Sequence, residues 1–323
     1  MTGKRPEPSP PATRIGVAIA VHNSWVVLEE CLERLATSEQ EAELHIVVFD
    51  DGSTDGTREH LSAHFPAVQV VRGDGAFWWT GGTNRAVEVC LAAGCDYILL
   101  LNPDVFVEID TIGRLLDTSR AHGDAVCAPI VADRDDPERV IWAGSRWGRL
   151  APGLPVWTSR YLHRRGSAVE AIPDKPYNTS EVHGRGVLFP SAVFRRFGLH
   201  DDRSLPHLGG DTEYSLHLLS GGVPMLIVPE AVVTLETSTS SLGMTGQDGT
   251  PWRMDDALTR YWHHLTDRRK GEQLSVWWTI ARRHVPWYAT VPSFAFIVGT
   301  GSVRFWQREL RSANRSRASG GVE

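Results

Sequence analysis

Residues 44–57 read LHIVVFDDGSTDGT, an apolar run that ends abruptly in acidic and small residues. This pattern is typical of a buried strand that leads through a tight turn into a helix. Residues 15–21 form a similar apolar strand, and Asn23 or Ser24 can cap a helix whose apolar positions recur over residues 27–35. The alternation of strands and helices predicts an α/β fold with a largely parallel central sheet.

The remaining elements follow the same alternation. Residues 97–101, YILLL, have the unbroken apolar character of a central strand that is covered on both faces. We also expect strands at residues 68–71 and 224–228 and helices at residues 55–64, 81–93, 110–122, 190–197 and 211–219. The chain divides into a disordered tail (residues 1–13), an α/β body (14–236) and a C-terminal helical and basic region (237–323), with a loop at 238–250 and helices at 252–266 and 273–283.

Composition excludes several classes of protein. The 323 residues, 41% hydrophobic and 22% charged, are typical of a soluble globular chain of about two domains. The 33 Lys and Arg against 39 Asp and Glu leave a formal charge of −6, which disfavours nucleic acid as a partner. Residues 260–317 differ from this average, because they hold 11 Lys or Arg and only 3 Asp or Glu. We therefore expect a separate role for that region.

Four cysteines bear on the cellular compartment. Cys31, Cys90, Cys95 and Cys127 lack the spacing of a zinc site, and each lies in an apolar segment typical of a protein core. Residues 1–13 are polar and Pro-rich, without the apolar segment of a secretion signal. We therefore predict a cytoplasmic protein, with peripheral attachment to the cytoplasmic face of a membrane as an extension of that prediction.

Two aspartates, Asp50 and Asp51, follow the 44–49 strand, where the carboxyl edge of an open α/β sheet forms its ligand crevice. Carboxylates there can accept hydrogen bonds from a base N–H or a ribose hydroxyl. Because Asp, Ser, Thr and Gly also suit a helix-capping turn, the turn alone supports both interpretations equally.

The tripeptide Asn102-Pro103-Asp104 follows the 97–101 strand and carries Asp104 into the same crevice. A divalent cation can bridge one carboxylate and a substrate diphosphate at such a position. A plain Asn-Pro-Asp turn is the alternative, and for the tripeptide alone it is the commoner one.

Two tryptophans stand beside paired glycines in residues 73–84, which read GDGAFWWTGGTN. Adjacent indoles suggest the wall of a sugar or base pocket, and backbone N–H groups at the start of a helix from Gly81 can face an anion. A Trp-capped corner of the core is the alternative. The sequence has neither a dinucleotide-binding G-x-G-x-x-G at its first strand and helix nor a G-K-[ST] phosphate loop.

Further along the chain, Asp211 opens a helix after a Gly-rich approach, so it is either a helix N-cap or a general base that faces a cavity. Glu213 follows as a second carboxylate. Residues 183–186, HGRG, can bring a cation and backbone amides close to phosphates, although a simple β-bulge explains the glycines equally well.

In order and spacing, the acidic turn, the Trp78–Asn84 segment, Asn102-Pro103-Asp104 and Gly210-Asp211 resemble the family 2 glycosyltransferases, particularly the rhamnosyltransferase-like bacterial members. The resemblance covers residues 14–236. It implies the GT-A fold, with a C-terminal helical extension outside it. It also implies an inverting transferase that uses a nucleotide-diphosphate sugar and a divalent cation, Mg²⁺ or Mn²⁺.

Residue roles follow from the resemblance by position. Asp211 matches the catalytic base, with Gly210 where the family usually has Glu. Asp104 matches the metal-binding aspartate of the DXD motif, with Asn102 where its first acid often stands. The resemblance implies nucleotide and donor binding by Ala20, His22, Asn23, Asp50, Asp51, Trp78, Trp79, Gly82, Asn84 and Asn102. It implies a pocket for donor and acceptor lined by Arg185, Gly186, His207, Gly210 and Glu213.

The C-terminal region combines aromatic and basic residues around a short apolar segment. Residues 285–298 are mostly apolar but are interrupted by two prolines and fall short of the ~20 residues that span a bilayer. Such a segment suits peripheral attachment to an anionic membrane surface. A helical subdomain or dimer interface with its tryptophans turned inward is an equal alternative. The tryptophans concerned are Trp252, Trp262, Trp277, Trp278, Trp287 and Trp306.

Together these observations predict an inverting glycosyltransferase of bacterial surface-polysaccharide synthesis. It would move a sugar from dTDP-rhamnose or a UDP-sugar to a hydroxyl of a glycan or lipid-linked acceptor, as a monomer or a homo-oligomer. A sugar nucleotidyltransferase is an alternative, but it should carry a Gly-rich basic loop where this chain has Ala20 to Asn23. A non-catalytic nucleotide-sugar sensor would keep the regions of Asp50 and Trp78 and lose the base.

Overall fold

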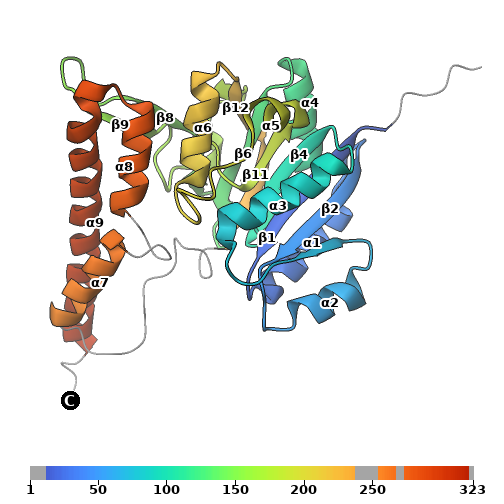
Figure 1. Cartoon of the computed structure of the whole chain (residues 1–323), viewed down its shortest axis with the longest axis horizontal. Coiled ribbons are helices and arrows are strands. Elements are labelled where there is room, and N and C mark those ends of the chain that lie inside the picture. Colours follow the sequence, from blue (N-terminus) through green and yellow to red (C-terminus); the bar gives the residue numbers. More distant parts are fainter. Residues whose placement is uncertain (1–11, 237–253, 267–272, 320–323) are drawn as a thin grey trace, which may run out of the picture.

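The computed structural model describes residues 12–236, 254–266 and 273–319. These residues form an α/β body and, beside it, an arm of helices (Figure 1). Residues 1–11 of the predicted tail, the 238–250 loop and Trp252 fall outside the described residues, so those expectations stay predictions. Thr13 is described and belongs to the body, because its carbonyl accepts the Glu43 N–H at 2.8 Å.

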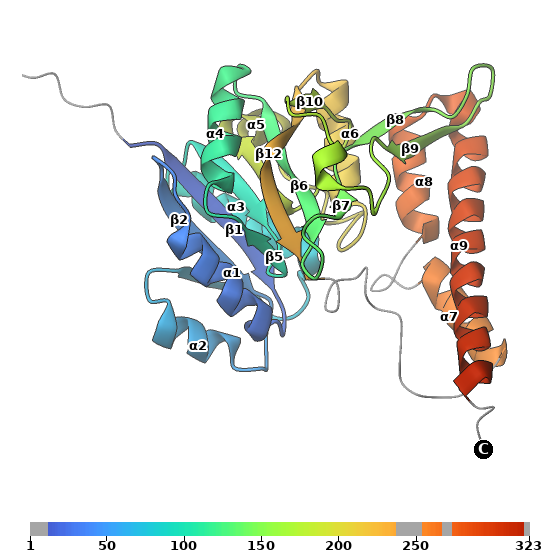
Figure 2. The ribbon, with the colours of Figure 1, turned by 180° about the vertical axis from the view of Figure 1, so that it is seen from behind.

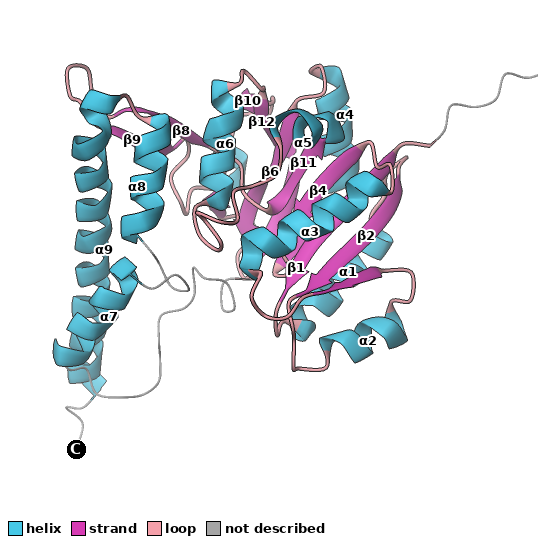
Figure 3. Cartoon of the chain, in the orientation of Figure 1, coloured by secondary structure: helices cyan, strands magenta, loops and turns pink. Residues whose placement is uncertain are grey.

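A mixed sheet of ten strands runs through the α/β body. The strands from β12 to β2 cross the body side by side (Figure 3). The main path of the sheet has the order β10-β12-β6-β11-β4-β1-β2-β3, while β5 pairs with β12 and β7 with β6. The strands are β1 (Arg14–Val21), β2 (Glu43–Asp50), β3 (Gln69–Arg72), β4 (Tyr97–Leu101), β5 (Val105–Val107), β6 (Val126–Asp133), β7 (Val140–Trp142), β10 (Tyr177–Asn178), β11 (Arg185–Pro190) and β12 (Met225–Leu235).

Strands β1 to β4 are mutually parallel, with β1 paired to both β2 and β4. This confirms the largely parallel sheet that the sequence predicts. Strand β11 departs from it, because it runs antiparallel between β4 and β6 and shifts register between Arg185 and Val187. The shift lies at Gly186, whose φ of +88° is accessible to glycine at little cost. This irregularity at Gly186 agrees with the β-bulge interpretation for that glycine, whereas phosphate binding by the 183–186 motif stays a prediction.

Helices cover both faces of the sheet. Helix α3 lies on one face, while α1 and α4 lie on the other (Figures 1 and 2). The helices of the body are α1 (Trp25–Thr37), α2 (Thr57–His64), α3 (Trp78–Ala92), α4 (Thr111–Ala121), α5 (Ser191–Phe197) and α6 (Gly210–Ser220), with a 3₁₀ turn at Val169–Ala171.

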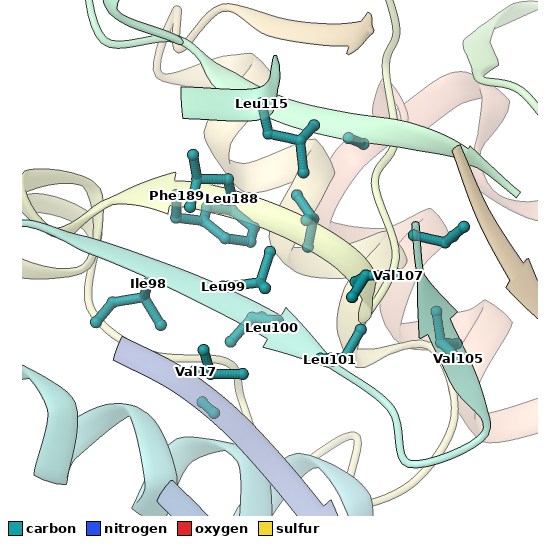
Figure 4. Close-up of a cluster of buried hydrophobic side chains, with 14 of the residues drawn as sticks. Val17, Ile98, Leu99, Leu100, Leu101, Val105, Val107, Leu115, Leu188 and Phe189 are labelled. Carbon is teal, nitrogen blue, oxygen red and sulfur yellow. The ribbon is translucent and has the colours of Figure 1, made fainter. Parts of the chain in front are cut away.

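The core lies between these layers. Strand β4 is buried along its whole length, as its unbroken apolar sequence predicts, and its side chains meet those of β1, β5 and β11 (Figure 4). Phe49, Phe106 and Phe189 are the largest fully buried side chains. All four cysteines are free and buried, which confirms that they belong to the core.

A second hydrophobic cluster joins the helical arm to the body. The arm consists of α7 (Met254–Thr266), α8 (Gln273–His284), a 3₁₀ turn at Trp287–Ala289 and α9 (Thr290–Ser319). Val276 and Ile280 of α8 pack against Leu205 and Leu216 of the body. Trp147 also belongs to this cluster and lies in a separate hairpin of β8 (Ser145–Arg149) and β9 (Trp157–Tyr161). Among the described helices, none is long and apolar enough to cross a bilayer.

The structure corrects three local expectations. Ser24 stands at the N-cap of α1 but makes no side-chain cap; Asp55 Oδ2 instead accepts the Trp25 N–H at 3.0 Å. Helix α3 begins at Trp78 rather than Gly81. Strand β12 continues to Leu235, well beyond Val228, because it pairs first with β6 and then also with β5.

Candidate active site

The carboxyl ends of β1, β2 and β4 meet at one edge of the sheet, because these three strands are parallel. Gly184, which directly precedes β11, ties this edge to the start of α6. It accepts a hydrogen bond from Asn102 N at 2.8 Å and donates one to Asp211 Oδ2 at 3.2 Å. A Cβ on Gly184 would lie 2.5 Å from Trp79 Cζ2, so only glycine lets these segments come together. The fold thereby brings Asn102 and Asp211 into one site.

Asp211 has the properties of a general base. Burial raises the pKa of this carboxyl to about 7, although the Gly184 N–H and the Arg185 guanidinium both act in the opposite direction. About a quarter of the side chain (24%) remains exposed, so a substrate hydroxyl can reach it. A carboxyl with a pKa near the working pH is well suited to take a proton.

His200 flanks this carboxyl, with its Nε2 atom 4.0 Å from Asp211 Oδ1. Burial lowers the pKa of His200 to about 4, so the imidazole is neutral near pH 7. Asn84 holds the His200 backbone through two hydrogen bonds, of 2.8 Å to the carbonyl and 3.1 Å from the amide. The expected donor contact of Asn84 is thus replaced by a positioning role. His200 itself carries no periodicity or motif in the sequence that would single it out.

Asp50 and Asp51 are buried and bind their own chain. Asp50 accepts hydrogen bonds from Ser53 N and from Arg58. Asp51 Oδ1 accepts from Gly75 N at 2.8 Å, and its Oδ2 accepts from Phe77 N and Trp78 N at 3.1 and 2.8 Å. These carboxylates therefore shape the crevice, and the structure does not present them to a ligand.

The same bonds correct the expectation of an anion site at the start of α3. The first N–H groups of this helix do face an anion, but the anion is Asp51. Trp78 holds a left-handed backbone conformation, φ 60°, which is uncommon for a residue other than glycine. Its ring lies edge-on to His207 at 5.8 Å, so these two predicted site residues do come together.

Trp79 turns toward the end of β4, where its Nε1–H donates to Asn102 Oδ1 at 2.8 Å. Its ring also lies edge-on to His200 at 6.0 Å. The indole is therefore part of the wall between the Asn-Pro-Asp turn and the base. Gly82, by contrast, fits against Phe49 and Ala20, where an added Cβ would approach within 2.9 and 3.1 Å, so its role is close packing.

Residues after β1 complete the crevice. His22 Nδ1 donates to the Asp51 carbonyl at 2.7 Å, and Asn23 Oδ1 accepts the Thr54 N–H at 2.7 Å. Both side chains are largely exposed. The end of β1 and the acidic turn thus form one continuous rim.

Asp104 and Arg185 form the charged part of the site. Burial raises the pKa of Asp104, opposed by the positive charge of Arg185. Burial also lowers the pKa of Arg185, whose charge is stabilised by Asp104 and then Asp211. Arg185 is half-buried and forms no close ion pair with Asp104 or Asp211, so its guanidinium can bind phosphate oxygens in a bidentate manner.

The donor set admits a divalent cation shared with substrate. Asp104 offers one carboxylate, whereas Asn102 Oδ1 already accepts the Trp79 indole N–H. Within the described part of the chain, no three His, Cys, Asp or Glu side chains cluster as a complete metal site. Mg²⁺ commonly uses one or two carboxylates together with substrate phosphates and water, so Asp104 fits that pattern.

Two predicted pocket residues have other surroundings. Glu213 accepts hydrogen bonds from Arg283 and His284 of α8, at 3.0 and 3.1 Å, and so faces the helical arm. Gly210 packs against Thr80, whose Oγ1 would lie 2.9 Å from an added Cβ. The structure therefore corrects the expectation for Glu213, while a pocket role for Gly210 stays a prediction.

Comparisons with known proteins identify the family to which the chain belongs. The family model described as glycosyl transferase family 2 matches residues 16–194, more than half of the chain. The chain belongs to glycosyl transferase family 2. A search among curated proteins found no match.

Solved structures of other glycosyltransferases share the fold of this family 2 chain. A crystal structure of GalNAc-T7 with UDP, GalNAc and Mn²⁺ has a TM-score of 0.54 at 15% identity and covers 89% of this chain. The chain spans 56% of the length of that GalNAc-T7 chain. Residues 1–349 of S. aureus TarS give a TM-score of 0.53 at 12% identity, with 95% of this chain and 92% of that chain covered. The fold is thus the GT-A fold that the sequence predicts.

Proposed function

We propose that this family 2 member is an inverting glycosyltransferase with Asp211 as its catalytic base. The observation that carries the proposal is a partly exposed carboxyl whose pKa is near 7, at the carboxyl edge of a parallel sheet, with Arg185 close enough for the two charges to interact. Nucleotide ligands bind at this edge in open α/β folds.

The reaction is a single displacement at the anomeric carbon of the donor sugar. The acceptor hydroxyl oxygen forms the new bond to this carbon while the bond to the departing diphosphate breaks, and the hydroxyl proton passes to the Asp211 carboxylate. Attack from the face opposite the diphosphate inverts the configuration. Arg185 stabilises the negative charge on the leaving diphosphate. A cation held by Asp104 would supply further electrostatic stabilisation of that diphosphate.

The crevice supports a nucleotide-sugar substrate. Trp78, Trp79 and His207 give it an aromatic wall, while Arg185 supplies the cation for a diphosphate. We propose dTDP-rhamnose or a UDP-sugar as donor, and a hydroxyl of a glycan or lipid-linked acceptor of surface-polysaccharide synthesis as acceptor.

A thermal-shift screen tests the proposal. The purified chain would be melted with UDP, dTDP, GDP, CDP or NAD, each with and without Mg²⁺ or Mn²⁺, and compared with Asp104→Asn. A ligand at a hundred times its Kd stabilises the folded state by about 2.7 kcal/mol. We expect one nucleoside diphosphate to raise Tm, with a cation dependence that Asp104→Asn removes.

No rise in Tm with any diphosphate, or a rise with NAD alone, would contradict a nucleotide-sugar transferase. Asp74→Asn is the matched control, because Asp74 is an exposed aspartate that caps its own turn through Ala76 N. This variant should keep the response to cation and nucleotide.

A further inference from the structure

The loop between α5 and α6, residues 198–209, carries side chains that border the base. His200 lies 4.0 Å from Asp211, and His207 meets the ring of Trp78. Residues 198–209 are all described, and they form turns and bends rather than a helix or strand. The conformation of this α5–α6 loop therefore depends on contacts with the elements around it.

Helix α3 supplies one set of these contacts. Thr80 N donates to the Pro206 carbonyl at 3.0 Å, and Thr80 Oγ1 donates to the Leu205 carbonyl at 2.7 Å. The two hydrogen bonds between Asn84 and the His200 backbone belong to the same set. Helix α3 thus fixes the loop against the α/β body.

Helix α8 of the arm supplies a second set. Leu205 is fully buried in the cluster that contains Val276 and Ile280. A Cβ on Gly209 would lie 2.5 Å from Val276 Cγ1, so α8 packs directly against the residue that precedes α6. Figures 1 and 2 show α8 beside α6. The loop is therefore held by the body and by the arm together.

Arg283, in the last turn of α8, binds the loop and α6 at the same time. Its Nη2 atom donates to Asp201 Oδ2 at 2.8 Å and to Ser204 Oγ at 3.3 Å, while Nη1 donates to Glu213 Oε1 at 3.0 Å. A planar guanidinium holds two acceptors in a fixed relative geometry, which a lysine ammonium does not reproduce.

The two acids that Arg283 binds are close in sequence to the two groups at the centre of the site. Asp201 directly follows His200, and Glu213 lies two residues after Asp211. Burial alone would raise the pKa of Asp201 and of Glu213, but hydrogen bonds, including those from Arg283, lower both. Both acids are therefore ionised near pH 7, and their hydrogen bonds to the guanidinium are charge-assisted.

We propose that Arg283 is a positioning residue of the active site, which sets the separation of His200 and Asp211 by binding the acid close to each. The arm, which lies beyond residues 16–194 of the family match, would then belong to the catalytic unit. Misplacing a reacting group by about 1 Å can reduce a rate about a hundredfold, so such a contact affects kcat without touching substrate. The inference rests on the proposed function, because it takes Asp211 as the base.

Hydrogen exchange of the full chain, followed by mass spectrometry, tests the positioning role without a substrate. Leu205 N donates to the Asp201 carbonyl at 3.0 Å, so the amide at this position should exchange slowly in the wild type. In Arg283→Ala we expect the amides of residues 200–213 to exchange about tenfold faster, with β1, β2 and β4 unchanged. Wild-type exchange of residues 200–213 in this variant would overturn the proposal.

Arg282→Ala is the matched control for each measurement. Arg282 is exposed, and it forms no ion pair with another residue in the described part of the chain. The variant removes the same charge from the same turn of α8, so its exchange and kinetics should equal those of the wild type.

Kinetics separate a positioning role from a merely structural contact. With dTDP-rhamnose or UDP-glucose as donor and water as acceptor, release of the nucleoside diphosphate gives kcat and KM. In Arg283→Ala we expect kcat to fall about tenfold, with KM for the donor unchanged. Free guanidinium should restore part of kcat, because Arg283 is partly exposed and lines a cavity of about 680 Å³.

Guanidinium should stimulate neither Arg282→Ala nor Asp211→Asn. A fall in kcat of Arg283→Ala that guanidinium does not reverse would overturn the positioning role. The two proposals also fail differently. Asp211→Asn with wild-type kcat would contradict Asp211 as the base, whereas an inactive Asp211→Asn beside a fully active Arg283→Ala would contradict the positioning role alone.

Discussion

Asp211 combines a raised pKa with partial access to solvent, and both properties have measurable consequences. Asp211→Asn keeps an oxygen that can accept the Gly184 N–H but removes the base. We expect kcat to fall by about 10²- to 10⁴-fold, with binding of the nucleoside diphosphate unchanged. Wild-type kcat/KM should rise with pH through a midpoint near 7, because only the ionised carboxyl takes the proton.

The same group affects stability, with a sign that follows from its raised pKa. The unfolded chain releases this proton near pH 4, whereas the folded chain keeps it to about pH 7. The contribution of Asp211 to the free energy of unfolding therefore decreases as the pH rises from 4 to 7. Asp211→Asn should melt at or above the wild-type temperature at pH 8. A kcat/KM profile without a limb near neutrality would argue against Asp211 as base.

At the scale of the element, Gly184 joins the end of β4, the start of β11 and the start of α6. Gly184→Ala would place a Cβ 2.5 Å from Trp79 Cζ2 and 3.1 Å from Asn102 Oδ1. We expect a loss of about 1–3 kcal/mol in the free energy of unfolding. Because the Gly184 N–H positions Asp211, kcat should also fall by tenfold or more.

Gly148 provides the control for this prediction. It lies in β8, has no positive φ, and nothing stands within 4 Å of an added Cβ. Gly148→Ala should leave kcat unchanged and stability equal or higher by up to about 1 kcal/mol, through the unfolded state. Equal urea midpoints for the two variants would show that the approach of Trp79 to Gly184 is not a constraint.

An element can be predicted from the sequence where local residues determine it. It cannot be predicted where the interactions join residues that are far apart in the chain. The apolar runs of β1, β2 and β4 predict their strands because burial on both faces selects such residues locally. The roles of Asp51 and Asn84 are not predictable, because their partners lie at least 24 residues away. Glu213 is an instructive error: two residues apart on a helix point about 200° apart, so Asp211 and Glu213 cannot share one site.

The C-terminal arm shows the same limit. The ranges of α7 and α8 follow from their periodicity, but the 30-residue α9 does not, because Pro292 suggests an interruption. In the structure Pro292 falls in the first turn, where its missing N–H has no partner to lose. The tryptophans of the arm have different surroundings: Trp277 packs inward, whereas Trp287 is exposed. No local sequence pattern distinguishes the two.

For the whole molecule, Glu213 is one polar anchor between arm and body, and Asp201 is a second, because it pairs with Arg283 at 2.8 Å. Burial alone would raise the pKa of Glu213, but hydrogen bonds from His284 and Arg283 outweigh burial and lower it. Its ionised form thus stabilises the fold above the unfolded pKa of about 4.5, and that contribution is lost as the pH falls through the lower folded value. Glu213→Gln should cost about 1–3 kcal/mol at pH 7.

Urea titration at pH 7 and pH 4 measures this difference, which should shrink at the lower pH. Glu88→Gln is the control, because Glu88 forms an exposed pair with Arg85 on α3 and should change stability by under ~1 kcal/mol. If both variants unfold at the wild-type midpoint, the bonds of Glu213 to α8 do not contribute to stability.

The backbone N–H groups of Gly75, Phe77 and Trp78 all donate to the Asp51 carboxylate. This part of the crevice wall therefore loses its conformational freedom on folding and not on ligand binding. The wall is ordered while the chain folds, with an internal carboxylate in the place of an external anion. A nucleotide that arrives later need not immobilise this backbone, so the entropy of ordering it does not reduce affinity. On this side of the site, binding should resemble docking to a rigid surface.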